Sequence, residues 1–327
     1  MRHVRQMARG SRTIAIDQSA SLGNSSSSSG LRIRCDDRKF PRRLNLGERN
    51  SLWKNPGVAE DEALFGDSVA DNYREYLEPV IFRPWAELLV NFVGLDKGQT
   101  VLDVAAGTGV VSRAAATRVG SGSRVIASDV SAAMLAQVPN GFPSNEVALQ
   151  SLECSATALE LPDSSVDAVF CQQGLQFIPD RPAAAREMFR VLRPGGKVGV
   201  AVWLSSPSVH PFIDYGDTLK AQRMSEPFPG AFDSSFLSMT ADEVESVLHA
   251  AGFKDTEVRI EHIELEWPSV RHAVSGVFGT PYGPIVAALD SDVRESVLED
   301  LQRRMTSPDG TPTKHVMTSI LARGRRP

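Results

Sequence analysis

A glycine turn between two acidic residues is the segment of this sequence best suited to ligand chemistry. An apolar stretch ends at Asp103, residues 105–109 (Ala-Ala-Gly-Thr-Gly) turn into a helix, and Asp129 ends the next apolar stretch, twenty residues after Gly109. Gly107 and Gly109 leave the backbone bare, so a ligand can approach the amides at the helix N-terminus. A carboxylate at the position of Asp129 can accept hydrogen bonds from both hydroxyls of a ribose. The simpler alternative is a tight strand–helix connection with Asp129 as a helix cap.

The residues around the turn indicate which kind of ligand it would bind. Asp103 stands just before the turn, where a carboxylate would repel a pyrophosphate but attract a ligand that carries an ammonium group. Ser112 occupies the position at which a dinucleotide fingerprint has Gly or Ala. Both residues therefore disfavour a nicotinamide dinucleotide, and a nicotinamide-dependent oxidoreductase is kept as an alternative.

Alternating strands and helices would position this turn. Apolar runs bounded by glycine turns predict strands at 100–104, 124–129, 147–153, 167–171 and 197–203, with helices between them. Residues 71–93 are predicted to be mostly helical with a break near Pro84, and Arg193 to Gly196 to form a turn. Strands that alternate with crossover helices predict an α/β fold with a doubly wound, mostly parallel sheet. Ligands of such sheets bind at the carboxyl ends of the strands.

The second half of the chain predicts the last strands of the same sheet and a helical insertion. Thr240 and Glu243 match a capping box, which would start a helix that ends at Gly252. Strands are predicted at 257–267 and near 315–321, with a helical insertion at about 271–307 between them. The insertion carries three large apolar side chains that suggest an apolar or aromatic guest: Phe278, Tyr282 and Ile285. We therefore expect one domain at 65–327, with its core at 98–204.

Residues 1–64 are predicted to lie outside this domain. The first part is rich in Arg and Ser and has no acid before Asp17, as in an organelle transit peptide, although a disordered tail is the alternative. We expect a mitochondrial or plastid location, with the cytoplasm as the alternative. Eleven Arg and Lys and four Asp and Glu give residues 1–50 a charge of +7, which leaves −12 for the rest of a chain of −5. Such an acidic body disfavours nucleic acid as a partner, and no apolar stretch is long enough to span a bilayer.

Three segments in sequence order resemble one family. VLDVAAGTGVVSRAA at 101–115, VIASDVSAAMLA at 125–136 and ATALELPDSSVDAVFCQQGLQFIPDRPAAAREMFRVLRPGG at 156–196 resemble the class I S-adenosylmethionine-dependent methyltransferases. The likeness is to their ubiquinone/menaquinone-biosynthesis-like branch, methyltransferase type 11. It runs from about Tyr73 to Trp203, and more loosely to Leu321. It implies a seven-stranded Rossmann-like sheet with an N-terminal helical lid, S-adenosyl-L-methionine as cofactor, and methyl transfer to a small apolar or aromatic molecule.

The glycine turn and this resemblance together assign roles to individual residues. The turn would line the methionine part of the donor, Asp129 would hold the ribose, and Gln172 would stand near the sulfonium and the substrate entrance. Tyr76 would belong to the lid, together with Tyr73 and residues 82–85. Ordinary core packing is the alternative for Tyr76, Trp85 and Met134. The predicted cofactor-binding residues are Tyr76, Asp103, Ala105, Ala106, Gly107, Thr108, Gly109, Asp129, Val130, Met134, Ser155, Ala156 and Gln172.

Two positions depart from the family pattern. Ala105 replaces the first glycine of the usual D-x-G-x-G turn, and we expect modest interference if its φ is negative. Ser155 replaces the usual acid at the adenine edge, which would lower the affinity for the donor by about 1 kcal/mol or more. These departures keep a non-catalytic binding protein as an alternative function.

The candidate catalytic residue is His210, which follows the fifth predicted strand. It would serve as a general base if the acceptor loses a proton, and a surface histidine is the alternative. The sequence shows no acid–histidine grouping at metal-ligand spacing, so we expect no metal. The expected partner is a small-molecule substrate, and the oligomeric state is open between a monomer and a homodimer.

Overall fold

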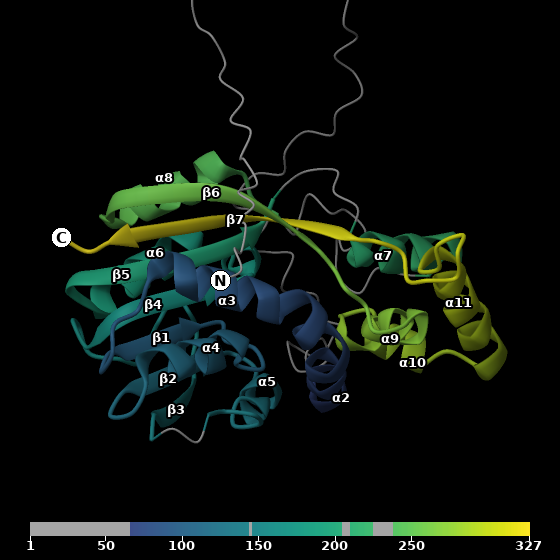
Figure 1. The fold of residues 1–327 in the computed structure, drawn as a ribbon, viewed down its shortest axis with the longest axis horizontal. Helices are drawn as coiled ribbons and strands as arrows, with labels where there is room; N and C mark the ends of the chain where they lie inside the picture. Colours follow the sequence, from purple (N-terminus) through teal and green to yellow (C-terminus); the bar gives the residue numbers. More distant parts are fainter. Residues whose placement is uncertain (1–65, 144–145, 205–209, 225–237) are drawn as a thin grey trace, which may run out of the picture. The chain divides into compact units, whose positions relative to one another are not determined.

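A sheet of seven strands forms the centre of the domain. The computed structural model describes residues 66–143, 146–204, 210–224 and 238–327, which all belong to one compact unit at Asn45–Pro327. The strand order is β3-β2-β1-β4-β5-β7-β6, with the first five strands in parallel and β7 antiparallel to both of its neighbours (Figure 1). The strands are β1 (Thr100–Val104), β2 (Arg124–Asp129), β3 (Ala148–Glu153), β4 (Val166–Gln172), β5 (Leu192–Trp203), β6 (Lys254–Glu264) and β7 (Val316–Arg325). The predicted doubly wound, mostly parallel sheet is confirmed.

Helices cover both faces of the sheet because successive side chains of a strand point to opposite faces. Val101 of β1 packs in one buried cluster with helices α3 (Arg83–Val93) and α4 (Val110–Val119). Its neighbour Leu102 packs in the other cluster, with α6 (Arg181–Val191) and α8 (Ala241–Ala251). The remaining helices are α2 (Asp67–Asn72), η2 (Tyr73–Phe82), α5 (Ala132–Gln137), η3 (Leu175–Phe177), α7 (Pro211–Ala221), α9 (Val270–Ser275), η4 (Gly276–Gly279), α10 (Gly283–Ala287) and α11 (Ser291–Arg304).

Local sequence signals set the ends of the best-predicted helices. Helix α4 begins after Gly109 and ends at Gly120, and both glycines have positive φ, of 84° and 72°. Helix α8 begins with the predicted capping box, in which Thr240 accepts from the Glu243 amide and the Glu243 carboxylate accepts from the Thr240 amide. It ends at Gly252, which is left-handed.

The N-terminal helical segment and strand β5 differ from the predictions. No break occurs near Pro84, because α2, the π-helix η2 and α3 follow one another without a gap. Pro84 lies in the first turn of α3, next to the change from π-helix to α-helix. Arg193 to Gly196 do not end a strand but form an irregularity within β5, where the pairing with β4 shifts from Leu192 to Lys197. The amide of Gly195 donates to the Arg326 carbonyl, which holds this irregularity against the last residues of β7.

The predicted insertion is a set of short helices between β6 and β7. Helices α9, η4, α10 and α11 replace one long helix, since Gly276, Gly279 and Pro284 interrupt it. The insertion lies beside α7, and the Tyr215 hydroxyl on α7 donates to the Ala273 carbonyl on α9 over 2.6 Å (Figure 1).

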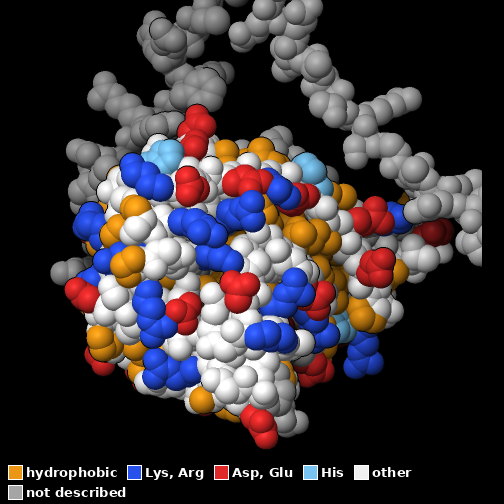
Figure 2. Space-filling view, turned by 60° about the vertical axis from the view of Figure 1, so that its left-hand side comes forward, with side chains coloured by type: hydrophobic (Ala, Val, Ile, Leu, Met, Phe, Trp, Pro, Cys, Tyr) orange, Lys and Arg blue, Asp and Glu red, His pale blue; other side chains and the backbone are white. Residues whose placement is uncertain are grey.

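The outside of the domain carries charges of both signs. Figure 2 shows Lys and Arg side chains interspersed with Asp and Glu on one face, although residues 51–327 are acidic in sum. The absence of a nucleic-acid partner therefore stays a prediction. No helix in the described ranges is long and apolar enough to cross a membrane. Residues 1–64 lie outside the described residues, so the domain boundary at 65 also stays a prediction.

Candidate active site

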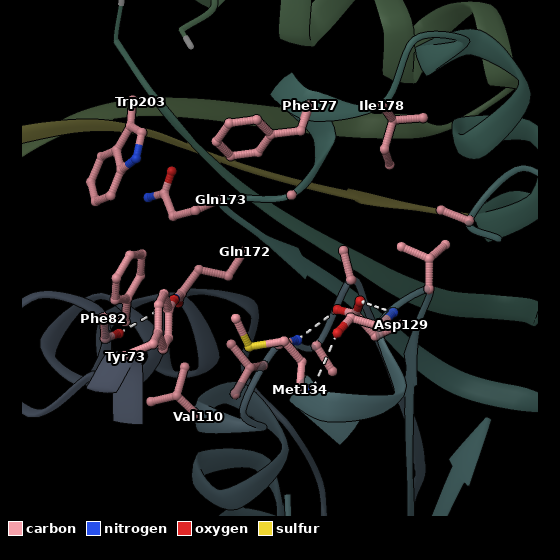
Figure 3. A pocket seen from close by; sticks show the side chains of 18 of the residues that line it. Tyr73, Phe82, Val110, Asp129, Met134, Gln172, Gln173, Phe177, Ile178 and Trp203 are labelled. Atoms are coloured by element: carbon pink, nitrogen blue, oxygen red, sulfur yellow. Dashed lines mark hydrogen bonds between the residues drawn. The ribbon is translucent and has the colours of Figure 1, made fainter. Parts of the chain in front are cut away.

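A cavity of about 760 Å³ opens at the carboxyl ends of the parallel strands. It lies where the strand order reverses between β1 and β4, as expected for ligand sites in such sheets. Figure 3 shows Asp129 at one end of the cavity and Met134 near its middle. Tyr73, Phe82 and Trp203 lie at the other end, together with the side chains of Gln172 and Gln173. Ten of the thirteen predicted cofactor-binding residues line it: Asp103, Ala105, Ala106, Gly107, Asp129, Val130, Met134, Ser155, Ala156 and Gln172.

The two glycines of the turn have different roles. Gly107 has a φ of 55°, and a Cβ built there would meet no atom within 4 Å, so its backbone is open to a ligand. Gly109 does not line the cavity, and a Cβ there would lie 2.7 Å from the Val138 side chain on the neighbouring helical segment. Gly107 thus exposes the turn, whereas Gly109 allows close packing behind it.

Asp129 closes the turn from the next strand. One carboxylate oxygen accepts from the Gly107 amide at 2.8 Å and the other from the Ser131 amide at 2.9 Å. Asp129 lies at the carboxyl end of β2 and lines the cavity, which is the place where a carboxylate can accept from the hydroxyls of a ribose. Ser155 also lines this end of the cavity, with its hydroxyl 2.9 Å from the Thr157 hydroxyl.

Asp103 places a buried carboxylate beside the turn. Its Oδ2 accepts from both the amide and the hydroxyl of Ser112, at 2.9 and 2.7 Å, while Oδ1 is buried without a hydrogen-bond partner among the described residues. Burial raises the pKa of Asp103 to about 7, against the lowering by the Ser112 hydrogen bonds. An ammonium group bound at Oδ1 would supply the missing partner and favour the ionised form. From the sequence, Ser112 was used only as an argument against a dinucleotide. Its role in orienting Asp103 was not predicted.

Ala105 adopts a backbone conformation that the sequence did not predict. Its φ is 53°, in the left-handed region that disfavours a side chain, whereas a negative φ was expected. A Cβ built on Gly174 would lie 2.6 Å from the Ala105 methyl, so the bare backbone of Gly174 makes room for this methyl. Space for the Ala105 side chain is therefore provided by the missing side chain of Gly174, and not by a favourable φ at Ala105.

Thr108 connects the turn to the lid instead of lining the cavity. Its hydroxyl donates to the Glu78 carboxylate on η2 at 2.6 Å, and both side chains are buried. The same carboxylate lies 2.5 Å from a guanidinium nitrogen of Arg113 on α4, and Arg113 also donates to the Thr108 carbonyl. We call Glu78, Thr108 and Arg113 the lid triad.

The lid tyrosine in the cavity is Tyr73. Tyr76, which the resemblance implied, lies outside: its ring meets the His272 ring edge-on at 5.2 Å, and its carbonyl oxygen lies 3.0 Å from His272 Nε2. Tyr73 stacks on Phe82 with ring centroids 4.6 Å apart, and both rings line the cavity. Of the two tyrosines that the sequence placed in the lid, η2 therefore presents Tyr73 to the cavity, whereas Tyr76, the one predicted to bind the cofactor, lies outside it.

His210 lies in the wall of the cavity next to α7. Its Nδ1 is buried with no hydrogen-bond partner in the described part of the chain. Burial, and then the nearby His315, lower the pKa of His210 to about 4, so the imidazole is neutral at physiological pH. A neutral imidazole can accept a hydrogen bond or a proton, although so low a pKa makes it a weak base.

Comparisons with known proteins agree with this geometry. Residues 102–200 match the family model described as a methyltransferase domain. The chain is 35% identical over 157 residues to the ubiquinone/menaquinone biosynthesis C-methyltransferase UbiE of Hahella chejuensis, a match that covers 45% of this chain. The chain spans 62% of the length of that relative.

Two solved structures share the fold. One is the Haemonchus contortus phosphoethanolamine N-methyltransferase 2 with S-adenosyl-L-methionine, with a TM-score of 0.50, 18% identity and coverage of 88% of this chain and 61% of that one. The other is an Anabaena variabilis protein from an antibiotic biosynthesis pathway, described as a methyltransferase, with a TM-score of 0.52, 18% identity and coverage of 76% and 98%. At 18% identity, these two structures show that the fold is shared and do not indicate a shared substrate.

The sheet order, the turn between two carboxylates and the family match define a class I S-adenosylmethionine-dependent methyltransferase domain with a Rossmann-like fold. Within that class, residues 102–200 match the methyltransferase-domain model, and the chain is similar over 157 residues to a ubiquinone/menaquinone-biosynthesis C-methyltransferase. The prediction of S-adenosyl-L-methionine as the cofactor is thereby confirmed for the family. The comparisons favour neither alternative, a nicotinamide-dependent oxidoreductase or a non-catalytic binding protein.

Proposed function

We propose that this protein transfers a methyl group from S-adenosyl-L-methionine to a small apolar or aromatic molecule. The observation that carries the proposal is a single cavity with two different ends. One end holds the bare Gly107 backbone, Asp129 and the unpaired oxygen of Asp103, and the other is walled by aromatic rings, among them Phe82 and Trp203. Donor and acceptor would meet between these ends, beside Gln172.

The residues of this chain would act mainly by alignment. The bound donor supplies a methyl group already activated by a sulfonium, so the protein must hold the acceptor atom in line with it and exclude water. Asp103 would bind the ammonium of the donor and Asp129 its ribose. His210 would accept a hydrogen bond, and with it the acceptor's proton where one is lost, because its imidazole stays neutral at physiological pH.

The activity is tested with a donor that carries an isotopically labelled methyl group. The full chain is incubated with the donor and a panel of phenols, amines and apolar ring compounds, and labelled products are identified by mass spectrometry. We expect label in at least one ring compound and formation of S-adenosylhomocysteine at the same rate. Donor binding without any labelled product from the panel would instead support the non-catalytic alternative.

Targeting by the first 64 residues is a separate proposal that rests on composition alone. Their Arg- and Ser-rich sequence suggests import into a mitochondrion or plastid. A fusion of residues 1–64 to a fluorescent protein should move to an organelle when expressed in a eukaryotic cell. A diffuse cytoplasmic signal would speak against the proposal and leave the function of the domain untouched.

A further inference from the structure

Two adjacent glutamines at the end of β4 bring polar atoms into the acceptor end of the cavity. Gln172 and Gln173 both line the cavity and are only 8% and 6% exposed. Adjacent residues of a strand normally point to opposite faces. The left-handed φ of Gln173, 52°, breaks this alternation, so both side chains reach the same cavity. Such strained conformations concentrate at functional sites.

Hydrogen bonding fixes the orientation of each amide. The amide nitrogen of Gln172 lies 3.0 Å from the Phe82 carbonyl oxygen, which can only accept a hydrogen bond. The amide nitrogen of Gln173 lies 3.1 Å from the Ser319 hydroxyl, whose single proton is donated to the Val202 carbonyl at 2.8 Å. In both cases the partner accepts from the NH₂ group, so neither amide can be reversed without losing its hydrogen bond.

The carbonyl oxygens of both amides therefore have no hydrogen-bond partner among the described residues. These two atoms, Oε1 of Gln172 and Oε1 of Gln173, are buried. A buried acceptor without a partner is destabilising, so a ligand that donates to it gains affinity. Phe82 holds the first of these amides and Ser319 the second, so each oxygen is kept as an acceptor for a hydrogen-bond donor of a bound molecule. We call these two oxygens the amide pair.

The charges of the cavity narrow the chemistry further. The acidic side chains in the described part of the wall are Asp103, Asp129 and Asp180, and that part of the wall contains no Lys or Arg. A carboxylate or phosphate on the acceptor would find no cationic side chain in this part of the wall and would lie close to amide oxygens, which cannot donate to it. Hydroxyl or amino groups would instead satisfy the amide pair, while Tyr73, Phe82 and Trp203 pack against an apolar ring.

We infer that the methyl acceptor is a ring compound without carboxylate or phosphate groups that donates two hydrogen bonds, one to the side-chain oxygen of Gln172 and one to that of Gln173. This inference rests on the proposed function, because it places the acceptor at the aromatic end of the same cavity. It assigns Gln173 as a specificity-determining residue and Ser319 as the residue that positions it.

The inference is tested by calorimetry with three ring compounds of similar size. The full chain is first saturated with S-adenosylhomocysteine, whose own titration reports on the donor site separately. Catechol has two hydroxyl donors, veratrole has both hydroxyls methylated, and salicylate has one hydroxyl replaced by a carboxylate. We expect catechol to bind at least about tenfold more tightly than either analogue, the scale of a lost hydrogen bond that leaves a buried acceptor unpaired.

Variants then assign the selectivity to the amide pair. Gln173→Leu should reduce the catechol-to-veratrole affinity ratio by about tenfold, and Ser319→Ala should reduce it less, since the amide then becomes free to reverse. The matched control is Gln176→Leu, because Gln176 is equally buried, its oxygen already accepts from the Trp203 amide, and it does not line the cavity. This control should leave the ratio unchanged.

Each remaining outcome decides the question. Equal binding of veratrole, tighter binding of salicylate, no binding of any of the three compounds, or a ratio that survives Gln173→Leu would overturn the inference. Normal titration with S-adenosylhomocysteine in the same samples would show that the donor site, and with it the proposed function, is unaffected by that failure.

Discussion

Single residues of the donor site carry departures from ordinary backbone and charge behaviour. Ala105 holds a left-handed conformation, Gly174 faces its methyl, and Asp103 is a buried carboxylate with one unpaired oxygen. Left-handed backbone costs about 1–2 kcal/mol in a residue with a side chain. Strained or unpaired groups of this kind are found where they help to bind a ligand. Substitution of Ala105, Gly174 or Asp103 should therefore have measurable effects on stability or on donor binding.

The contact between Ala105 and Gly174 predicts strong coupling of two substitutions. Gly174→Ala should lower the free energy of unfolding by about 1–3 kcal/mol, because its new Cβ would overlap the Ala105 methyl. Ala105→Gly removes both that methyl and the left-handed strain, so the double variant should recover most of the loss. Urea denaturation of the four proteins gives the coupling energy, which we expect to be at least about 1 kcal/mol. Additive effects would mean that the two residues do not share this space.

The raised pKa of Asp103 predicts how donor binding depends on pH. Because the pKa is about 7 in the free protein, Asp103 is largely protonated below that pH, and the ammonium of the donor then loses its partner. The association constant for S-adenosyl-L-methionine should rise by up to about tenfold per pH unit from pH 5 to 7, the limit for a single proton. Asp103→Asn should bind more weakly and show a flat profile in the same calorimetric titration. A wild-type profile as flat as that of the variant would contradict the assignment.

The same residue affects the stability of the free protein in the opposite sense. A carboxyl whose folded-state pKa lies above its unfolded value holds its proton more tightly when folded, so its contribution to stability is full at low pH and is lost as pH rises through about 7. The side chain introduced by Asp103→Asn does not ionise, so this variant should not lose stability for this reason as the pH rises. Its melting temperature relative to the wild type should therefore increase between pH 5 and 8 in the absence of donor.

At the scale of elements, the lid triad couples η2 to the glycine turn and α4. Glu78 is 4% exposed. Its carboxylate accepts a hydrogen bond from the Thr108 hydroxyl and forms an ion pair with the Arg113 guanidinium. A buried ion pair adds little net stability, but removing one partner leaves an uncompensated charge. Tyr73 lies on the same helical segment as Glu78 and lines the cavity, so a displacement of η2 would move Tyr73 as well.

Breaking the lid triad should affect stability and donor binding together. Glu78→Gln should lower the free energy of unfolding by about 1–3 kcal/mol, because Arg113 keeps a hydrogen-bond partner but loses its counter-charge. Affinity for S-adenosyl-L-methionine should fall with it, since the turn and the lid share Thr108. Glu87→Gln, on the exposed side of α3, is the control and should change stability by less than about 0.5 kcal/mol. Equal behaviour of the two variants would show that the triad does not hold the lid.

The ends of helices that depend on neighbouring residues, such as caps and glycines, could be predicted from the sequence. The positions of side chains that depend on residues far away in the sequence could not. The glycine turn that ends at Gly109 gave the start of α4, and the capping box and Gly252 gave both ends of α8. The sequence could not show that η2 turns Tyr73 rather than Tyr76 inward. The roles of Gln172 and Gln173 also depend on partners 90 and 146 residues away, which no local pattern reveals.

At the scale of the whole molecule, the structure describes one methyltransferase domain and leaves residues 1–64 as a sequence-based proposal. If those residues are an extension, a chain that begins at residue 65 should keep the melting temperature of the full chain within a few degrees and bind the donor equally well. Scanning calorimetry and donor titration of both chains check this. Loss of cooperative unfolding in the shortened chain would show that the domain needs part of the first 64 residues.

If this cavity is the donor site, Asp129 binds the ribose of the donor beside the bare Gly107 backbone. The most direct test is the dissociation constant of S-adenosyl-L-methionine for the wild type and for Asp129→Ala, with the melting temperature of both to verify folding. We predict tight enough binding to titrate in the wild type and a loss of at least about tenfold in the variant, the scale of lost hydrogen bonds to a charged group. An unchanged dissociation constant in a folded variant would contradict the assignment of this cavity as the donor site.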